Sequence, residues 1–244
     1  MKLFGLIGFP LSSSFSRNHF SEKFEKENID ARYDLFPLEN IQLFSELINR
    51  NEFSGLNVTI PYKQQVIPFL DELDVTASEI GAVNAIRFMR ENGIQTTRGY
   101  NTDAIGFEMS LIPLLKTQHT KALILGTGGS SKAVAYVLKK NNISFHFVSR
   151  NEMENQYTYE DLTQEIIENT PLIINTTPLG MYPIDSCPEI PYAYIGKQHL
   201  LYDLVYNPAK TVFLEKGENQ GAEIKNGLDM LYGQAKAAWE VWNS

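Results

Sequence analysis

The sequence predicts an α/β fold with two α/β domains, one of them a Rossmann-type parallel sheet. Apolar strand-like runs alternate with helix-like segments along most of the chain, and a glycine-rich turn separates one such strand from the helix that follows. Strands that alternate with helices are typical of parallel, doubly wound sheets. Near the end, residues 228–242 carry apolar side chains at three- to four-residue spacing, which predicts a helix with one apolar face.

The middle of the chain contains the clearest unit of this fold. Residues 121–125 form a short apolar run, residues 126–130 a glycine-rich turn, residues 131–140 a helical pattern and residues 144–149 a second strand. The order strand, glycine turn, helix, strand predicts a βαβ unit. The alternation then continues with a helix over 159–168, a strand over 172–175, a strand over 200–205, a helix over 211–219 and a strand over 222–224.

The first part of the chain alternates as well, without a phosphate-binding turn after its first strand. We predict strands over 3–7, 31–36 and 55–58 and helices over 18–27 and 43–49. A serine-rich loop, residues 12–16, follows the first strand instead of a glycine turn. We expect the final helix to pack on this first domain. The expected boundaries are therefore 1–101 with 227–244 for one domain and 102–226 for the dinucleotide-binding domain.

Composition excludes several classes of protein. A net charge of −8 over 244 residues argues against a broad nucleic-acid surface, which needs a basic patch. No apolar stretch approaches the roughly 20 residues that span a bilayer. Cys187 is the single cysteine and the four histidines are scattered, so neither a disulfide nor a metal site is expected. We expect a cytoplasmic protein with a small-molecule substrate, either a monomer or a homodimer.

The glycine turn is a candidate phosphate-binding loop. Gly126 permits a tight turn, and Gly128 and Gly129 let the backbone approach a pyrophosphate at a helix N-terminus. Ser131 stands where the third glycine of the dinucleotide fingerprint is usual. Such turns also occur where a sheet simply changes direction, and the strand before and the helix after favour the dinucleotide interpretation.

The end of the second strand indicates which dinucleotide is bound. NAD-selective sites usually carry a carboxylate there, whereas this chain has Ser149, Arg150 and Asn151. A guanidinium matches a 2′-phosphate with two hydrogen bonds, which favours NADP. An ordinary surface arginine is the alternative, and Glu152 and Glu154 would weaken a phosphate site.

Two further polar segments lie where strands or helices meet loops. Lys63 comes just after the predicted strand 55–58, and such strand ends are where ligands bind in open α/β sheets. Asp103 opens a predicted helix that Asn101 or Thr102 would cap. A solvated lysine and a carboxylate that favours the helix dipole are the alternatives.

Taken together, the motifs resemble those of the shikimate dehydrogenase family. The resemblance runs nearly end to end and is carried by these segments, in order: Gly8-x-Pro10 with Ser14-x-Ser16, NVTIPYK (57–63), GAVNAI (81–86), GYNTDAIGF (99–107), GTGGSSKA (126–133), NTTPLGM (175–181), YDLVYNP (202–208) and NGLDMLYGQA (226–235). The family implies reversible, NADP-dependent reduction of 3-dehydroshikimate to shikimate, a step of chorismate and aromatic amino acid biosynthesis. It also implies that residues 1–101 and 227–244 form the substrate-binding domain.

The resemblance further implies a role for individual residues. Lys63 and Asp103 match the catalytic pair of the family. The implied substrate ligands are Ser14, Ser16, Thr59, Asn84, Asn101, Tyr206 and Gln234. The implied cofactor residues are Gly126, Gly128, Gly129, Ser149, Arg150, Asn151, Thr176, Met181 and Gly227. Neutral donors and acceptors of these types suit a small polyol acid.

The chain departs from the family pattern, and two other functions stay open. Ser13 and Arg17 replace the usual histidine and proline of the serine loop, whereas the two serines expected to bind the substrate are retained. A quinate/shikimate dehydrogenase that uses NAD or both cofactors is the nearest alternative. A non-catalytic ligand-sensing homologue is more distant, because such a protein should lack Lys63 or Asp103.

Overall fold

The computed structural model describes residues 1–11, 14–152, 154–184 and 186–244. The chain divides into two compact units. Unit 1 comprises Met1–Thr102 with Gln234–Ser244, and unit 2 comprises Asp103–Gly233. Each unit has its own six-stranded sheet. In the described part of the chain, no helix has the length and apolar character needed to cross a membrane.

The sheet of unit 1 is mixed, with the strand order β2-β1-β3-β5-β6-β4. β1 pairs in parallel with β2 and β3, whereas β5 is antiparallel to both β3 and β6. The strands are β1 (Lys2–Gly8), β2 (Ala31–Pro37), β3 (Phe53–Val58), β4 (Glu72–Leu73), β5 (Ala85–Glu91) and β6 (Ile94–Tyr100). The first three confirm the predicted strands. The hairpin β5–β6 was not predicted, although its turn, Asn92–Gly93 with φ of 52° and 80°, is a common hairpin signal.

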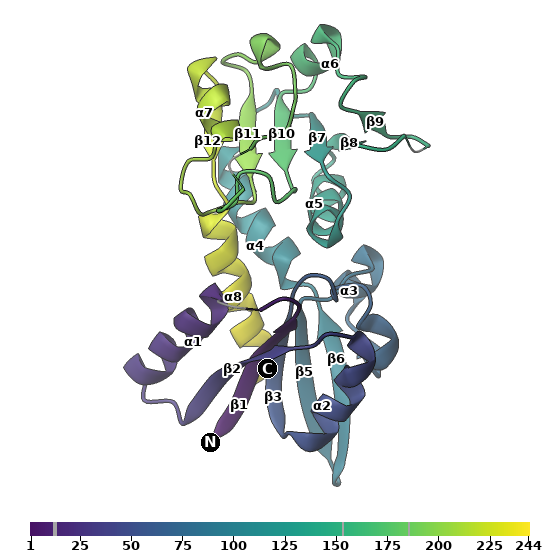
Figure 1. The fold of residues 1–244 in the computed structure, drawn as a ribbon, viewed down its shortest axis with the longest axis vertical. Coiled ribbons are helices and arrows are strands. Elements are labelled where there is room, and N and C mark those ends of the chain that lie inside the picture. The colour runs from purple at the N-terminus through teal and green to yellow at the C-terminus, as the bar shows by residue number, and fades with distance from the viewer. Residues whose placement is uncertain (12–13, 153, 185) are drawn as a thin grey trace. The chain divides into compact units, whose positions relative to one another are not determined.

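Helices cover both faces of this sheet (Figure 1). They are α1 (Phe15–Lys26), α2 (Phe44–Arg50), α3 (Val75–Ile80) and the end of α8 (Leu228–Asn243). On one face, Phe20 of α1 and Trp242 of α8 pack with Phe4 of β1. On the other, Phe44 of α2 packs with Leu56 of β3. Helix α1 begins three residues before the predicted position because Ser14 caps it.

The sheet of unit 2 is entirely parallel, which confirms the predicted Rossmann-type fold. Its strand order is β12-β11-β10-β7-β8-β9, so the order reverses on either side of β7, as in doubly wound dinucleotide-binding folds. The strands are β7 (Lys121–Leu125), β8 (Ser144–Ser149), β9 (Tyr157–Thr158), β10 (Leu172–Asn175), β11 (Leu200–Asp203) and β12 (Glu223–Lys225). Ligands bind such sheets at the carboxyl ends of the strands that flank the reversal.

Helices also cover both faces of the second sheet. They are α4 (Thr102–Leu111), α5 (Gly129–Lys140), α6 (Gln164–Glu168) and α7 (Val212–Asn219). Phe213 of α7 packs with Leu201 of β11 on one face. The next residue of β11, Tyr202, points to the opposite face, where its ring meets Phe107 of α4 edge-on at 5.1 Å.

Two predicted boundaries in this unit are wrong for a shared reason. The helix expected over 159–168 begins only at Gln164, because the Asp161 carboxylate accepts two hydrogen bonds from Thr158 and holds the preceding segment in a turn. The strand expected over 200–205 ends at Asp203, whose carboxylate accepts the backbone N–H of Val205. In both cases a side chain competes with the regular backbone pattern.

Candidate functional site

The serine loop of unit 1 leads directly into α1. Ser14 is the N-cap of this helix, and its Oγ accepts the backbone N–H of Ser16 at 3.1 Å. The positive end of the helix dipole therefore coincides with two serine hydroxyls, an arrangement that suits a carboxylate. Arg17 is exposed in the first turn. Ser13 lies outside the described residues.

Thr59 and Lys63 follow β3 on a short turn. The N–H of Thr59 donates to Ile7 of β1 at 2.9 Å, and the N–H of Tyr62 donates to the Thr59 carbonyl at 2.9 Å. The carbonyl of Lys63 accepts the N–H of Val83 at 2.7 Å, so the backbone at the lysine is tied to the segment before β5. The Lys63 side chain is half-buried.

Asn84 and Asn101 are buried and hold neighbouring segments together. The Asn84 Oδ1 accepts the backbone N–H of Thr102, the first residue of α4, at 2.6 Å, and its Nδ2 donates to the Thr102 hydroxyl at 3.0 Å. The Asn101 Nδ2 donates to the Ala82 carbonyl at 2.9 Å. The structure thus brings the segments GAVNAI and GYNTDAIGF together, and Asp103, also buried, follows Thr102.

The sequence did not predict a role for Tyr33 and Asn57, two buried polar residues that are hydrogen-bonded to each other and to the Asn84 backbone. The Tyr33 hydroxyl donates to Asn57 Oδ1 at 2.8 Å, and Asn57 Nδ2 donates to the Asn84 carbonyl at 3.2 Å. Ser16 hydrogen-bonds the Tyr33 hydroxyl, and burial raises the pKa of Tyr33 despite that bond. The available signal was an asparagine between a leucine and a valine of a predicted strand, since a buried amide requires hydrogen-bond partners.

The glycine turn of unit 2 has the geometry expected of a phosphate-binding loop. Gly126 has φ of 101°, which a residue with a side chain adopts only under strain. Gly128 is the N-cap of α5, and a Cβ added to it would meet no heavy atom within 4 Å. Among the described residues, no side chain caps this helix. Ser131 replaces the third glycine without disturbing the turn, because its buried Oγ donates to the Gly128 carbonyl at 2.7 Å.

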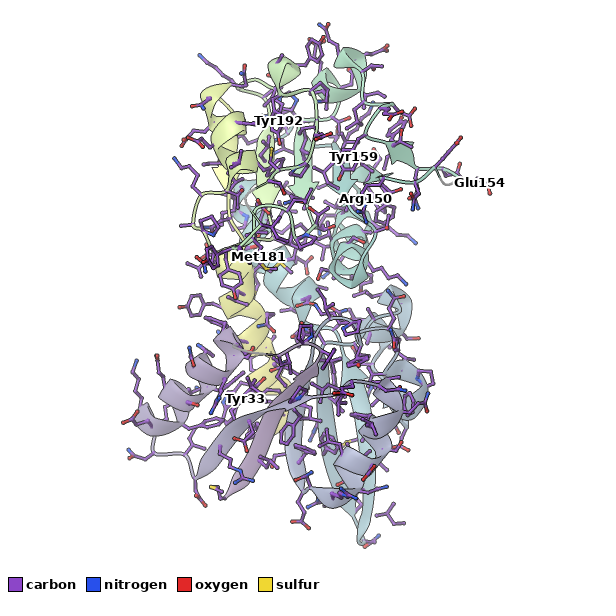
Figure 2. The ribbon with its side chains drawn as sticks, in the orientation of Figure 1. Tyr33, Arg150, Glu154, Tyr159, Met181 and Tyr192 are labelled. Atoms are coloured by element: carbon purple, nitrogen blue, oxygen red, sulfur yellow. The ribbon has the colours of Figure 1, made fainter. Side chains whose placement is uncertain are left out.

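Three predicted cofactor residues lie where β8 ends. Ser149 and Asn151 form a tight turn, in which the Asn151 N–H donates to Ser149 Oγ at 3.2 Å. Arg150 is exposed between them, and its charge lowers the pKa of Tyr159, which burial raises more strongly. Figure 2 shows Arg150 at the strand end and Glu154 at the outer tip of the segment that leads to β9.

The loop after β10 carries Thr176 and Met181, and the loop after β11 carries Tyr206. Thr176 hydrogen-bonds the Leu125 carbonyl with both its N–H and its hydroxyl, at 2.9 and 2.7 Å. A Cβ at Gly126 would lie 3.0 Å from the Thr176 hydroxyl, so the structure brings this threonine and the glycine turn together. Met181 and Tyr206 are partly exposed.

Gly227 and Gln234 lie at the start and in the middle of the last helical segment. Gly227 approaches the Leu204 carbonyl so closely that a Cβ would lie 2.1 Å from its oxygen. Gln234 is buried within α8 and belongs to unit 1. Within the described residues, no cluster of three or more His, Cys, Asp or Glu side chains could hold a metal ion.

Comparisons with known proteins find similar sequences and a matching family model. The family model described as the shikimate dehydrogenase substrate binding domain matches residues 6–86. The chain is 36% identical, over 98% of its length and 90% of the relative's, to shikimate dehydrogenase (NADP(+)) of Methanosphaera stadtmanae.

Two solved structures that resemble nearly the whole chain are also named shikimate dehydrogenases. Shikimate dehydrogenase 1 from Peptoclostridium difficile is 36% identical and superposes with a TM-score of 0.85, covering 100% of this chain and 92% of the other. Shikimate 5-dehydrogenase from Thermus thermophilus, crystallised with NADP(H) and shikimate, is 27% identical with a TM-score of 0.85, covering 99% and 93%.

Proposed function

Because the chain belongs to the shikimate dehydrogenase family, we propose that it is an NADP-dependent oxidoreductase that reversibly reduces 3-dehydroshikimate to shikimate. The observation that carries this proposal is a match of 36% identity over 98% of the chain to a relative named for that activity. We assign substrate binding mainly to unit 1 and dinucleotide binding to unit 2. The all-parallel sheet and the glycine turn of unit 2 support the second assignment.

The residues of unit 2 fit NADP. The open space beside Gly128, at the N-terminus of a 12-residue helix, suits a pyrophosphate that approaches the backbone closely. Gly126 and Gly129 complete this loop, and Thr176 lies against it. Arg150, exposed at the end of β8, would hold the 2′-phosphate, with Ser149 and Asn151 beside it. Met181 and Gly227 would border the nicotinamide.

Lys63 is the proposed acid/base of the reaction. The bound cofactor supplies the hydride that reduces the ketone. As negative charge develops on the ketone oxygen, the Lys63 ammonium stabilises it and delivers the proton. Asp103, the partner carboxylate, orients the lysine and the reacting hydroxyl. The backbone bonds that fix the turn before Lys63 support this role, since an acid/base must be held in one position.

Neutral side chains are proposed to bind the substrate. Ser14 and Ser16 would bind its carboxylate at the N-terminus of α1, where the helix dipole favours an anion. This local attraction matters because a net charge of −8 repels anions overall. Tyr206 would lie near the carboxylate, and Thr59, Asn84, Asn101 and Gln234 would bond the hydroxyls.

An absorbance assay at the reduced-nicotinamide band tests the function. Shikimate and quinate are each supplied with NADP and with NAD to the purified protein. The proposal expects rapid reduction with shikimate and NADP and much slower reduction in the other three pairs. Comparable rates with quinate or NAD would indicate a broader enzyme, and shikimate binding without any reduction would indicate a non-catalytic homologue.

The role of Lys63 is tested with Lys63→Ala. We expect kcat to fall by at least about 100-fold, the smaller end of what a general acid/base contributes. Lys26→Ala, an exposed lysine in the last turn of α1, is the matched control. A kcat for Lys63→Ala within about tenfold of wild type contradicts the assignment.

We also propose that the enzyme is cytoplasmic and acts as a monomer or a homodimer. A single cysteine, Cys187, is typical of a reducing compartment, where disulfides are rare. Light scattering on the purified protein distinguishes the two oligomeric states.

A further inference from the structure

Asp203 is a buried carboxyl group that the proposed reaction does not use. It lies at the carboxyl end of β11 and is 0% exposed. A buried carboxylate is costly unless donors surround it. Here its Oδ1 accepts from Asn175 Nδ2 at 2.9 Å and from the Val205 N–H at 3.0 Å, and its Oδ2 accepts from the Thr211 hydroxyl at 2.6 Å.

Asn175 extends this network into the loop after β10. Its Oδ1 accepts from the N–H and the hydroxyl of Thr177, at 3.0 and 2.6 Å. Its Nδ2 donates to the Leu179 carbonyl at 3.3 Å as well as to Asp203. One side chain thus shapes residues 175–179, and the Asp203 carboxylate fixes that side chain.

The same carboxylate fixes the segments that follow β11. The bond to Val205 turns the chain just before Tyr206, and the bond to Thr211 holds the N-cap residue of α7. Gly180 packs on that threonine, since a Cβ at Gly180 would lie 3.1 Å from Thr211 Cβ. Asp203 therefore connects both ends of the segment from Asn175 to Gly180.

This segment leads to residues proposed to contact the cofactor. Thr176 lies within it, and Met181 follows Gly180 directly. Both lie at the carboxyl ends of parallel strands, beside the point where the strand order reverses around β7. A displacement of this loop would move Thr176 away from the glycine turn, which it touches through the Leu125 carbonyl.

We propose that Asp203 is a positioning residue for NADP, because its carboxyl group holds the β10 and β11 loops in the conformation that presents Thr176 and Met181 to the cofactor. This inference rests on the proposed function. The two N–H partners of Asp203 donate to Oδ1, and the third partner, the Thr211 hydroxyl, can accept as well as donate. An asparagine therefore keeps the network when its oxygen takes the Oδ1 position and its amide donates to the Thr211 hydroxyl. An alanine removes every bond.

The experiment measures the Kd for NADP by titration calorimetry for wild type, Asp203→Ala and Asp203→Asn. We expect the alanine variant to bind NADP about tenfold more weakly or worse, because it removes all three hydrogen bonds that hold the two loops. The asparagine variant should bind within about threefold of wild type. Ser110→Ala is the control, because it removes another buried hydrogen bond of unit 2, to Tyr202, whose side chain points to the opposite face of the sheet from the Asp203 side chain.

Three results would overturn the inference. The first is a folded Asp203→Ala with the wild-type Kd for NADP. The second is a Ser110→Ala variant that loses as much stability as Asp203→Ala and also loses as much affinity for NADP. If Asp203→Ala does not fold, Thr177→Val takes its place, since it removes the Thr177 hydroxyl that donates to Asn175 in the same loop. The third result is then a Kd for NADP in Thr177→Val that equals the wild-type value. Failure of the wild-type protein to bind NADP would instead reject the proposed cofactor, whatever the variants do.

Discussion

The titration of Asp203 makes the stability of the protein depend on pH in an unusual direction. Burial raises the pKa of this carboxyl group from 3.8 to about 6, although its three hydrogen bonds oppose the shift. The native state therefore keeps a proton on Asp203 between pH 3.8 and about 6, where the unfolded state has lost it. Because the native state binds more protons in this window, the free energy of unfolding falls as the pH rises through it.

The size of the effect follows from the pKa difference. A difference of about 2 units corresponds to about 3 kcal/mol at 1.36 kcal/mol per unit. As the pH rises from about 4.5 to 7.5, the free energy of unfolding loses about 2 kcal/mol of this stabilisation. The remainder is lost below about pH 4.5, between the pKa of the unfolded state and the start of the measured range. Tyr192, whose pKa responds to the charge of Asp203, stays neutral here because burial raises its own pKa.

Asp203→Asn isolates this contribution. Urea denaturation at a series of pH values gives the free energy of unfolding for wild type and variant, and the difference between them cancels the titration of all other groups. We expect the wild type to lose about 2 kcal/mol relative to the variant from pH 4.5 to 7.5. A difference that stays constant, or that moves in favour of the wild type as the pH rises, refutes the reasoning.

Three other substitutions have contrasting expected outcomes. Gly128→Ala should leave the free energy of unfolding within about 0.5 kcal/mol of wild type, because its Cβ meets nothing within 4 Å, yet calorimetry should show at least tenfold weaker NADP binding. Gly227→Ala should cost about 2 kcal/mol or more in urea denaturation, because its Cβ would lie 2.1 Å from the Leu204 oxygen. Tyr33→Phe should cost about 1–3 kcal/mol in the same assay, because it removes the donor to buried Asn57 Oδ1. Wild-type NADP binding in the first variant, or wild-type stability in either of the others, would contradict these expectations.

In the sheet of unit 2, β7 and β8 occupy the predicted residues, 121–125 and 144–149. Residues 122–125 of β7 are a continuous buried apolar run, which is typical of a parallel strand between two helical layers, whereas β8 is fully buried only at its last two residues. The hairpin β5–β6 has many half-buried polar residues, so its pattern is weak. Only its Asn92–Gly93 turn could have indicated it.

The candidate site was predictable where one segment forms it alone. The glycine turn can be recognised from spacing, because strand, turn and helix are consecutive in the chain. Asp203 and Asn175 could not be paired in this way, because they are 28 residues apart and meet only when β10 and β11 lie side by side. Buried polar pairs of this kind are set by the topology of the sheet, so a single sequence gives the residue types and not their partners.

Asn84 shows why a binding role and a structural role must be tested separately at this site. Its side-chain oxygen accepts a hydrogen bond from the backbone N–H of Thr102, the first residue of α4. The next residue along that helix is Asp103, the proposed catalytic partner. In Asn84→Ala, any loss of activity would combine a lost substrate contact with a displaced start of α4. Asn84→Asp keeps an oxygen to accept the Thr102 N–H and removes the amide donor, so it separates the two. If the aspartate variant restores stability and not shikimate binding, the amide donor contributes to binding; if it restores both, the main role of Asn84 is to hold the helix that carries Asp103.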